Sequence, residues 1–213
     1  MALETTVYNA LNTVILSRVP STVTRVLDVG CAIGRLGENI KRYTKARVTG
    51  ITISQQEANL ARCVLDEVLV CDLNSLQEQS LGTYDCIICS HVLEHLYHPE
   101  EVLRRLASRL DSNGYLLVAL PNILHWRQRL RFLSGNFRYT ESGLLDHGHY
   151  RFFDWETARA LVAEAGYQIL SAEAEGTFPL SRYLWFVGKL LDRASVKIFP
   201  GLFGVQFIIK ARR

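Results

Sequence analysis

Apolar residues along the chain follow two alternating patterns, short continuous runs and stripes at helical spacing. The runs predict buried strands over residues 25–29, 47–53, 67–71, 84–89 and 115–120. The stripes predict helices that lie between those strands, over residues 34–43, 54–65 and 99–110. Strands that alternate with helices favour a mostly parallel sheet with helices on both faces.

Residues at the ends of the predicted elements support these boundaries. Ser54 precedes one helix as an N-cap, and Pro99 opens another in its first turn, where a proline loses no helical hydrogen bond. We expect a turn at Asn113-Gly114, before the fifth strand. An amphipathic helix over residues 3–18 precedes the first strand, and Pro20 ends it.

The last third of the chain is less regular. Asn122 is expected to cap a short helix that ends at Leu133, and residues 134–153 are irregular and rich in Gly, His and aromatic residues. Asp154 caps a further helix, and Gly166 ends it at the position where a left-handed glycine is favoured. A strand over residues 167–174, an apolar helix over residues 180–192 and a last strand over residues 204–211 complete the chain.

Length and composition fit one soluble α/β domain. The chain has 213 residues and a net charge of +3, which is too small to indicate nucleic-acid binding by itself. Five cysteines without framework spacing indicate free thiols in a reducing compartment, and Cys86 and Cys89 should face opposite sides of their strand. The pattern shows neither a signal peptide nor an apolar run of about 18 residues, so we expect a cytoplasmic protein.

Candidate chemistry begins at residues 26–34, Val-Leu-Asp-Val-Gly-Cys-Ala-Ile-Gly, where an apolar strand meets an acidic residue and a glycine turn. Helical spacing resumes after the turn, and such a unit lets a ligand approach bare backbone beside a helix N-terminus. Three further strand ends carry polar residues, at Thr52, Asp72 and Ser90. Because the carboxyl ends of parallel strands meet at one edge of a sheet, these residues predict a single binding site.

In four motifs the chain resembles the class I S-adenosylmethionine-dependent methyltransferases. The motifs are residues 26–31, residues 48–54, Cys71-Asp72-Leu73, and Tyr84-Asp85 followed by residues 92–95. The resemblance implies a Rossmann-like α/β fold, with a seven-stranded, mostly parallel sheet flanked by helices and an antiparallel last strand. It also implies one domain over residues 1–213, in which residues 22–120 bind S-adenosylmethionine and residues 121–213 form the substrate side. S-adenosylhomocysteine would be the product.

The resemblance implies which residues bind the cofactor. Asp28 would organise the loop and the amino end of the cofactor, and Asp72 would accept a hydrogen bond from the adenine amino group. Gly30 and Gly34 would let the backbone approach the methionine and ribose portions. The full set is Asp28, Gly30, Cys31, Ala32, Gly34, Thr52, Ile53, Asp72, Leu73, Ser90 and His91.

Two residues depart from the family pattern. Thr52 stands where the family usually has an acidic residue for the ribose hydroxyls, and a neutral hydroxyl makes a weaker hydrogen bond than a carboxylate. The Thr-Ile-Ser sequence does resemble the Thr-Leu-Ser of the cyclopropane-synthase branch. Ala32 replaces a glycine, and its Cβ allows close approach only if φ is negative there.

The acceptor is expected to be a hydroxyl, because the chain lacks the Asn/Asp-Pro-Pro-aromatic motif that marks many amino methyltransferases. A hydroxyl must lose its proton, and His149 and His147 are the candidate bases since imidazole titrates near neutral pH. Both could instead hold a loop by hydrogen bonds. His91, Glu94 and His95 are an alternative metal set, in partial likeness to some quinone-biosynthesis O-methyltransferases.

Residues 121–133 and the segment around His149 are similar to methyltransferases of surface-polysaccharide and sugar biosynthesis and to MetW-type methionine-biosynthesis proteins. The arginines here could hold a phosphate or carboxylate, or form a solvated helix face. The residues expected to bind the acceptor are His95, Asn122, Trp126, Arg127, Tyr150 and Arg151.

Several alternatives remain open at this stage. The acceptor could be a sugar or a lipid-linked molecule, and the protein could instead be a MetW-like accessory protein that regulates a partner enzyme. An RNA methyltransferase is a third hypothesis, although nucleic acid is disfavoured. The apolar residues 178–207 are expected to cover the sheet, with a homodimer face or peripheral membrane contact as alternatives.

Overall fold

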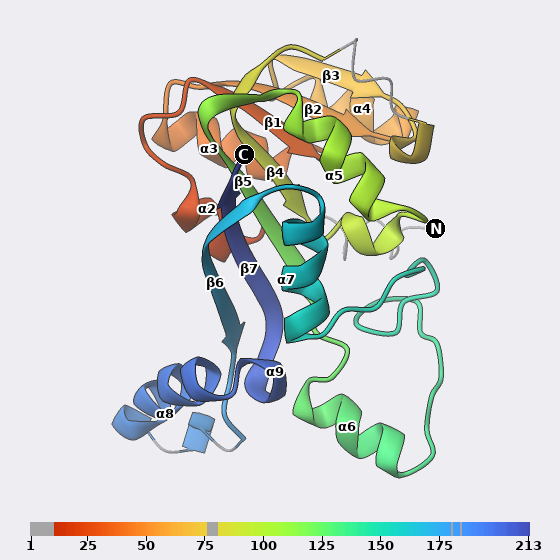
Figure 1. Cartoon of the computed structure of the whole chain (residues 1–213), viewed down its shortest axis with the longest axis vertical. Coiled ribbons are helices and arrows are strands. Elements are labelled where there is room, and N and C mark those ends of the chain that lie inside the picture. The colour runs from red at the N-terminus through yellow and green to blue at the C-terminus, as the bar shows by residue number, and fades with distance from the viewer. Residues whose placement is uncertain (1–10, 76–80, 180, 184) are drawn as a thin grey trace.

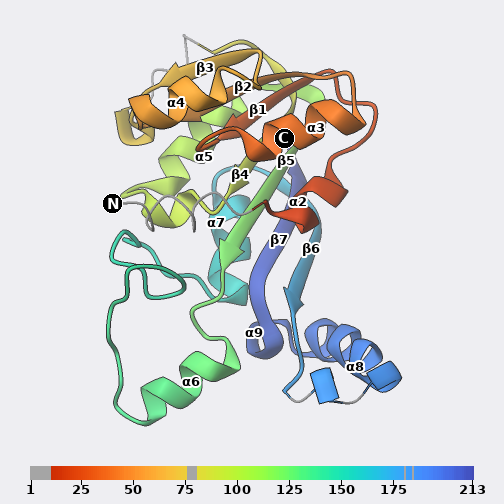
Figure 2. The same ribbon diagram turned by 180° about the vertical axis from the view of Figure 1, so that it is seen from behind.

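One seven-stranded sheet organises the molecule, with helices packed on both of its faces (Figures 1 and 2). The computed structural model describes residues 11–75, 81–179, 181–183 and 185–213. The strand order is β3-β2-β1-β4-β5-β7-β6. The strands are β1 (Arg25–Val29), β2 (Arg47–Thr52), β3 (Glu67–Val70), β4 (Tyr84–Ser90), β5 (Leu110–Pro121), β6 (Gln168–Gly176) and β7 (Gly204–Arg212).

Only β7 runs against the other strands. β1 to β5 pair in parallel, and β7 pairs antiparallel with both β5 and β6. The predicted mostly parallel sheet with an antiparallel last strand is therefore confirmed.

Two apolar cores lie on opposite faces of the sheet. α2 (Thr13–Arg18), α3 (Arg35–Tyr43) and α4 (Gln55–Ala61) contribute to one core. α5 (Pro99–Ala107) and α7 (Trp155–Glu164) contribute to the other. Cys86 and Cys89 belong to different cores, as their spacing on a strand predicts.

The remaining helices lie beyond the carboxyl ends of β5 and β6 (Figure 1). They are α6 (Trp126–Leu133), α8 (Trp185–Ile198) and α9 (Pro200–Phe203). Among the described residues none of the helices combines the length and apolar character needed to span a bilayer.

Several predicted helix ends are confirmed by their hydrogen bonds. Ser54 accepts a bond from the backbone N–H of Glu57, and Asp154 forms a capping box with Thr157. Gly166 has a φ of +93° after α7, and Pro99 lies in the first turn of α5.

Four predicted boundaries are wrong. Asn113-Gly114 is no turn before the fifth strand: β5 begins at Leu110, and the register between β4 and β5 shifts across this stretch, so the two residues lie in a bulge. α4 and α5 end at Ala61 and Ala107, a few residues before their predicted ends. α8 begins at Trp185 and runs to Ile198, later than predicted. Leu180 and residues 3–10 of the predicted first helix lie outside the described residues.

The expected N-cap at Asn122 is also wrong. α6 begins at Trp126, after His125, and Asn122 is completely buried. Its side-chain amide donates to the carbonyl oxygens of Gly201 and Gly204, at 3.1 and 2.7 Å, and its oxygen accepts from the N–H of Leu124. Asn122 therefore joins the end of β5 to α9 and β7.

The expectation that residues 178–207 cover the sheet holds for only part of that segment. Phe207 in β7 is fully buried in the core. Val187, Leu190 and Ile198 of α8 are exposed, because α8 packs on η4 (Ser181–Tyr183), β6 and α9 and leaves its outer face open.

Candidate functional site

A pocket of about 1020 Å³ opens at the carboxyl edge of the sheet. It is lined by residues from the ends of β1, β2, β3 and β4, from α2, from the loop before α7, and from the facing ends of β6 and β7. The sequence-predicted residues that line it are Gly30, Ala32, Thr52, Ile53, Asp72, Leu73, Ser90, His91, His95 and His149. Sequence-distant motifs thus share one cavity of a size suited to a cofactor and a small acceptor.

The glycine loop after β1 brings backbone to the pocket wall. Gly30 has a φ of +79°, and its N–H and that of Cys31 donate to the carbonyl of Ile51 at 2.9 and 2.8 Å. A Cβ at Gly30 would lie 2.7 Å from Val92, so no larger residue fits without a shift. Gly34, with a φ of +85°, is the N-cap of α3.

The backbone at Ala32 differs from the negative φ that the sequence analysis required for close approach of a ligand. Its φ is +46°, in the left-handed region that costs a residue with a Cβ roughly 1 kcal/mol or more. His91 is the second non-glycine residue with a positive φ in the described part of the chain, at +52°. Both line the pocket, and such backbone strain concentrates at functional sites.

Asp28 lies behind the loop and is almost completely buried. Burial raises the pKa of its carboxyl to about 7, although a hydrogen bond from the backbone of Gly37 opposes the shift. Its Oδ2 atom has no hydrogen-bond partner among the described residues. Oδ2 is thus a buried, unpartnered hydrogen-bond acceptor behind the glycine loop, and Asp28 does not itself line the pocket.

The end of β2 supplies an acid that sequence reasoning missed. The Thr52 hydroxyl donates to Glu57 Oε2 at 2.7 Å, and both residues line the pocket. Glu57 comes from the first turn of α4, which Ser54 caps. The carboxylate expected on the strand end is therefore provided one helical turn later, and the spacing Thr-x-Ser-x-x-Glu is the signal that could have indicated it.

Asp72 lies at the end of β3 and is exposed to the pocket. Its Oδ1 accepts bonds from the backbone and side-chain nitrogens of Asn74, both at 2.9 Å. These bonds fix the carboxylate and make Asn74 a further pocket residue that the sequence did not reveal.

His91 joins β4 to the antiparallel half of the sheet. Its Nε2 lies 2.8 Å from Gln206 Oε1 and its Nδ1 lies 3.3 Å from Glu94 Oε1. Burial lowers the pKa of His91, but the bond to Glu94 and its charge, with Gln206 and Glu175, raise it overall. Two acceptors on opposite ring nitrogens favour the imidazolium form.

Asn12 extends this network to the N-terminal helix. Its side-chain amide donates to Ser90 Oγ at 3.3 Å and to Gln206 Oε1 at 3.0 Å. Asn12 and Gln206 both line the pocket, and neither has a local motif from which sequence reasoning could find it.

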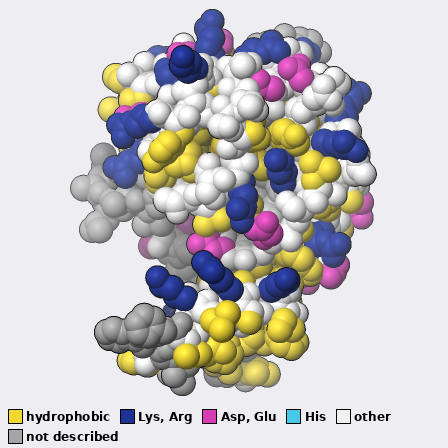
Figure 3. All heavy atoms as spheres, turned by 90° about the vertical axis from the view of Figure 1, so that its left-hand side faces the viewer, with side chains coloured by type: hydrophobic (Ala, Val, Ile, Leu, Met, Phe, Trp, Pro, Cys, Tyr) yellow, Lys and Arg dark blue, Asp and Glu magenta, His cyan; other side chains and the backbone are white. Residues whose placement is uncertain are grey.

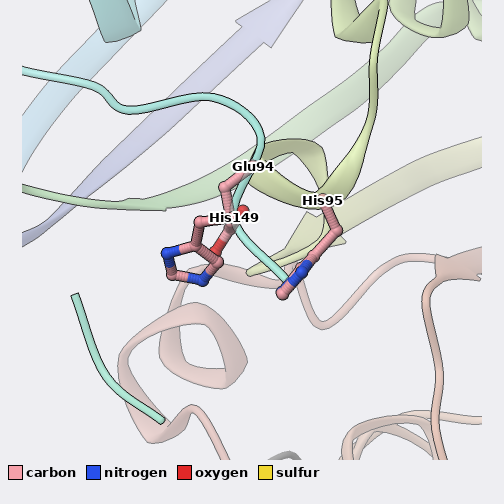
Figure 4. A group of neighbouring side chains, drawn as sticks. All are labelled: Glu94, His95 and His149. Carbon is pink, nitrogen blue, oxygen red and sulfur yellow. The ribbon is translucent and has the colours of Figure 1, made fainter. Parts of the chain in front are cut away.

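Glu94, His95 and His149 converge on one wall of the pocket (Figure 4). Their nearest donor atoms all lie within 4.8 Å of one another. Glu94 is 1% exposed, and its Oε2 has no hydrogen-bond partner among the described residues. His95 Nδ1 lies 2.9 Å from the carbonyl of Gly148, and His149 Nδ1 lies 3.3 Å from that of Leu144. Each contact favours the tautomer whose Nε2 carries the lone pair.

Burial lowers the pKa of His149, and the charge of His95 lowers it further. Glu94, Asp146 and the Leu144 carbonyl oppose this shift without reversing it. His149 is therefore neutral near pH 7 and able to accept a proton.

The same cluster is a donor set for a divalent cation. Two imidazoles and one carboxylate suit zinc or another transition metal. The sequence suggested His91, Glu94 and His95 for this alternative. The structure instead groups His149 with Glu94 and His95, while the ring of His91 faces Gln206 and Glu94.

Other predicted residues lie outside the pocket. Asp28, Cys31 and Gly34 support the loop from behind without lining the cavity. His147 is mostly exposed, with Glu141 at 3.7 Å. Of the expected acceptor-binding residues, five do not line the pocket, namely Asn122, Trp126, Arg127, Tyr150 and Arg151.

These five residues make contacts of their own. Arg151 donates to the carbonyl of Tyr97, and the Tyr150 ring packs against the Tyr97 ring at a tilt, with centroids 4.5 Å apart. Arg127 lies over the Trp126 ring. The pocket lining holds no Lys or Arg among the described residues, whereas it holds the acids Glu57, Asp72, Glu94, Asp146 and Glu175.

Fold and pocket together define a class of protein, the α/β proteins that bind a nucleoside-containing ligand at the carboxyl edge of a Rossmann-like sheet. The profile of the family described as "Methyltransferase domain" matches residues 8–172. The chain therefore belongs to this family, and the sequence-based recognition of an S-adenosylmethionine-dependent methyltransferase is confirmed.

Known proteins agree with this assignment. The chain is 32% identical over 124 residues to the ubiquinone biosynthesis O-methyltransferase of Xanthomonas axonopodis pv. citri, covering 54% of this chain and 52% of that protein. The chain thus spans about half the length of the curated relatives it matches.

Solved structures show the same fold at low identity. A SAM-dependent methyltransferase from Archaeoglobus fulgidus superposes with a TM-score of 0.66 at 21% identity, over 91% of this chain and 87% of that one. Magnesium protoporphyrin IX methyltransferase from Synechocystis, solved with bound SAH, superposes with a TM-score of 0.61 at 19% identity. The match covers 95% of this chain and 81% of that one.

Proposed function

We propose that this protein transfers a methyl group from S-adenosylmethionine to a hydroxyl oxygen of a small molecule, with His149 as the general base. The observation that carries the proposal is the arrangement of the pocket. Acids in the segments that follow β2 and β3 line one side, and a neutral, buried imidazole lines another. The curated relatives, which are named as O-methyltransferases, support an oxygen acceptor.

The pocket residues fit the cofactor by charge and by shape. S-adenosylmethionine carries a sulfonium and an ammonium group, and an acidic lining without Lys or Arg among the described residues favours such a ligand. Glu57 and Thr52 offer oxygens for the ribose hydroxyls, and Asp72 offers an acceptor for the adenine amino group. Gly30 has no side chain, and its contact with Val92 leaves no room for one, so the loop presents bare backbone to the cofactor.

The cofactor supplies a methyl group on an already activated leaving group, so the protein must mainly align the acceptor and remove its proton. His149 Nε2 takes the hydroxyl proton while the new oxygen–carbon bond forms and the sulfur–carbon bond breaks. The Glu94 carboxylate then faces the imidazolium and stabilises it.

Methyl transfer from labelled S-adenosylmethionine tests the proposal, with a panel of phenols, catechols, sugars and lipid-linked alcohols at pH 5 to 9. Because the pKa of His149 is lowered, activity should fall only when the pH drops below about 6.5. His149→Gln should lower kcat by about 10²- to 10⁴-fold and abolish this acid limb, with unchanged affinity for S-adenosylhomocysteine. His147→Gln, outside the pocket, is the matched control and should stay close to wild type.

Other outcomes would favour other functions. Retention of activity in His149→Gln, or transfer to amines alone, would contradict the proposal. Activity that a chelator removes and a divalent cation restores would assign the cluster to a metal. Binding of S-adenosylhomocysteine without transfer to any acceptor, together with a stable protein partner, would support the accessory role.

A further inference from the structure

The connection between β6 and β7 is far longer than the pairing of these strands requires. Adjacent antiparallel strands can be joined by a two-residue hairpin. Here residues 177–203 intervene and form η4, α8 and α9. The connection, which we term the β6–β7 insert, lies outside the matched residues 8–172. It begins at the pocket residue Thr177, directly after Glu175 and Gly176, which also line the pocket.

The inner side of the insert is anchored to the protein. Gly188 packs so closely on the backbone of Ser181 that a Cβ would lie 2.1 Å from its carbonyl oxygen. Asp192 is the single acidic residue of α8, and its carboxylate accepts the backbone N–H of Phe178 at 2.6 Å. The Asp192 carboxylate, the only acidic group of α8, therefore faces the inner side and not the outer face of the helix.

The outer side of α8 divides into a cationic stripe and an apolar stripe. Lys189, Arg193 and Lys197 are exposed and recur every four residues, which places them on one face. Among the described residues no ion pair reaches any of the three.

At 3.6 residues per turn, Val187, Leu190 and Ile198 occupy the adjoining stripe, and they are 56%, 67% and 65% exposed. Tyr183 before α8 and Phe199 after it are also more than half exposed. Figure 3 looks onto the side of the molecule where α8 lies and shows apolar side chains gathered at its base, with Lys and Arg side chains directly above them.

We propose that the β6–β7 insert docks this protein on an anionic phospholipid bilayer. A helix with an exposed apolar stripe beside a stripe of unpaired cations fits the boundary between acyl chains and negative headgroups. The apolar side chains enter the boundary, and the cations contact headgroup phosphates beside it. Docking goes beyond methyl transfer, since it depends on neither the cofactor nor the acceptor.

Vesicle co-sedimentation of the full chain tests the proposal, with vesicles of phosphatidylcholine alone and with about a third of phosphatidylglycerol. The protein should bind the anionic vesicles at low salt and be largely released at high salt, because surface charges are screened. Each cation contributes roughly a fivefold gain in partitioning. The triple variant Lys189→Glu, Arg193→Glu, Lys197→Glu should therefore lose about 100-fold or more in binding.

Two further variants separate the contributions. Lys45→Glu, Arg62→Glu, Arg104→Glu makes the same charge change at exposed positions on other elements and should bind nearly as wild type. Val187→Asn, Leu190→Asn, Ile198→Asn should weaken binding at low and at high salt. Circular dichroism and S-adenosylhomocysteine binding check that each variant folds.

Three results would overturn the proposal. One is absence of wild-type binding to anionic vesicles at low salt. A second is equal loss in the α8 and control charge variants. The third is a dimer in light scattering that the apolar variant dissociates, with no vesicle binding, which would assign the stripe to a second copy of the chain. None of these outcomes bears on methyl transfer, because the assay measures no reaction.

Discussion

Asp28 couples the ionisation of one buried carboxyl to the stability of the fold. Burial raises its pKa from 3.8 to about 7 in the folded protein. The folded state therefore holds this proton more tightly than the unfolded state does, so the stabilising contribution is complete below about pH 4 and is lost as the pH rises to about 7.

Asp28→Asn removes this pH dependence. Relative to wild type, the variant should gain unfolding free energy between pH 4 and pH 7, by on the order of 4 kcal/mol, and the gain should level off above pH 7. Urea unfolding of the ligand-free proteins at pH 4.5, 6 and 8 measures the difference. A difference that stays constant across this range would show that Asp28 has no raised pKa.

At the scale of elements, Asn122 connects three parts of the carboxyl edge. Its side chain makes bonds to Gly201 in α9, to Gly204 at the start of β7 and to the turn before α6. Asn122→Ala leaves two carbonyls and one N–H without these partners, so it should lower the unfolding free energy by about 2–4 kcal/mol. Denaturant unfolding measures this loss, and the exposed Asn136→Ala is the control. An equal loss in both variants would contradict the structural role.

Periodicity and capping chemistry predicted most elements because these signals are local. The alternation of strands and helices, the Ser54 and Asp154 caps and the glycine loop all follow from residues within a few positions of each other. The bulge in β5 was not predictable in this way. Asn113-Gly114 is a strong local turn signal, but β5 pairs with β4 on both sides of it, at Leu110 and at Tyr115, so the two residues lie within the strand.

The candidate site divides in the same way. Residues at or just after a strand end, such as Thr52, Asp72 and His91, could be predicted to share a pocket because strand ends meet at one sheet edge. Glu57 follows Thr52 and Ser54 at a spacing that could have indicated it, whereas Gln206 reaches the pocket through tertiary packing and carries no local motif. Asn122 and Arg127 do not line the pocket, because the Asn122 side chain bonds to Gly201 and Gly204 and Arg127 lies over Trp126, and such side-chain directions depend on the surrounding fold.

At the scale of the whole molecule, the pocket joins the parallel half of the sheet to its antiparallel half. Glu57 and Asp72 come from the first half, whereas Glu175 and Gln206 come from the second. His91 and Asn12 both contact Gln206 across this division. A ligand that fills the pocket should therefore stabilise both halves together, as one cooperative unit.

S-adenosylhomocysteine at 100 times its Kd should add about 2.7 kcal/mol to the unfolding free energy and raise Tm by roughly 5–10 °C in a single transition. Asp72→Ala should weaken binding about tenfold, a loss of roughly 1.4 kcal/mol, and reduce the shift at the same concentration. Glu164→Ala, which changes an exposed acid on α7, should leave the shift intact. Calorimetric scans with and without ligand measure these quantities. Two transitions, of which the ligand moves one, would show that the halves unfold separately and that the contacts through Gln206 do not couple them.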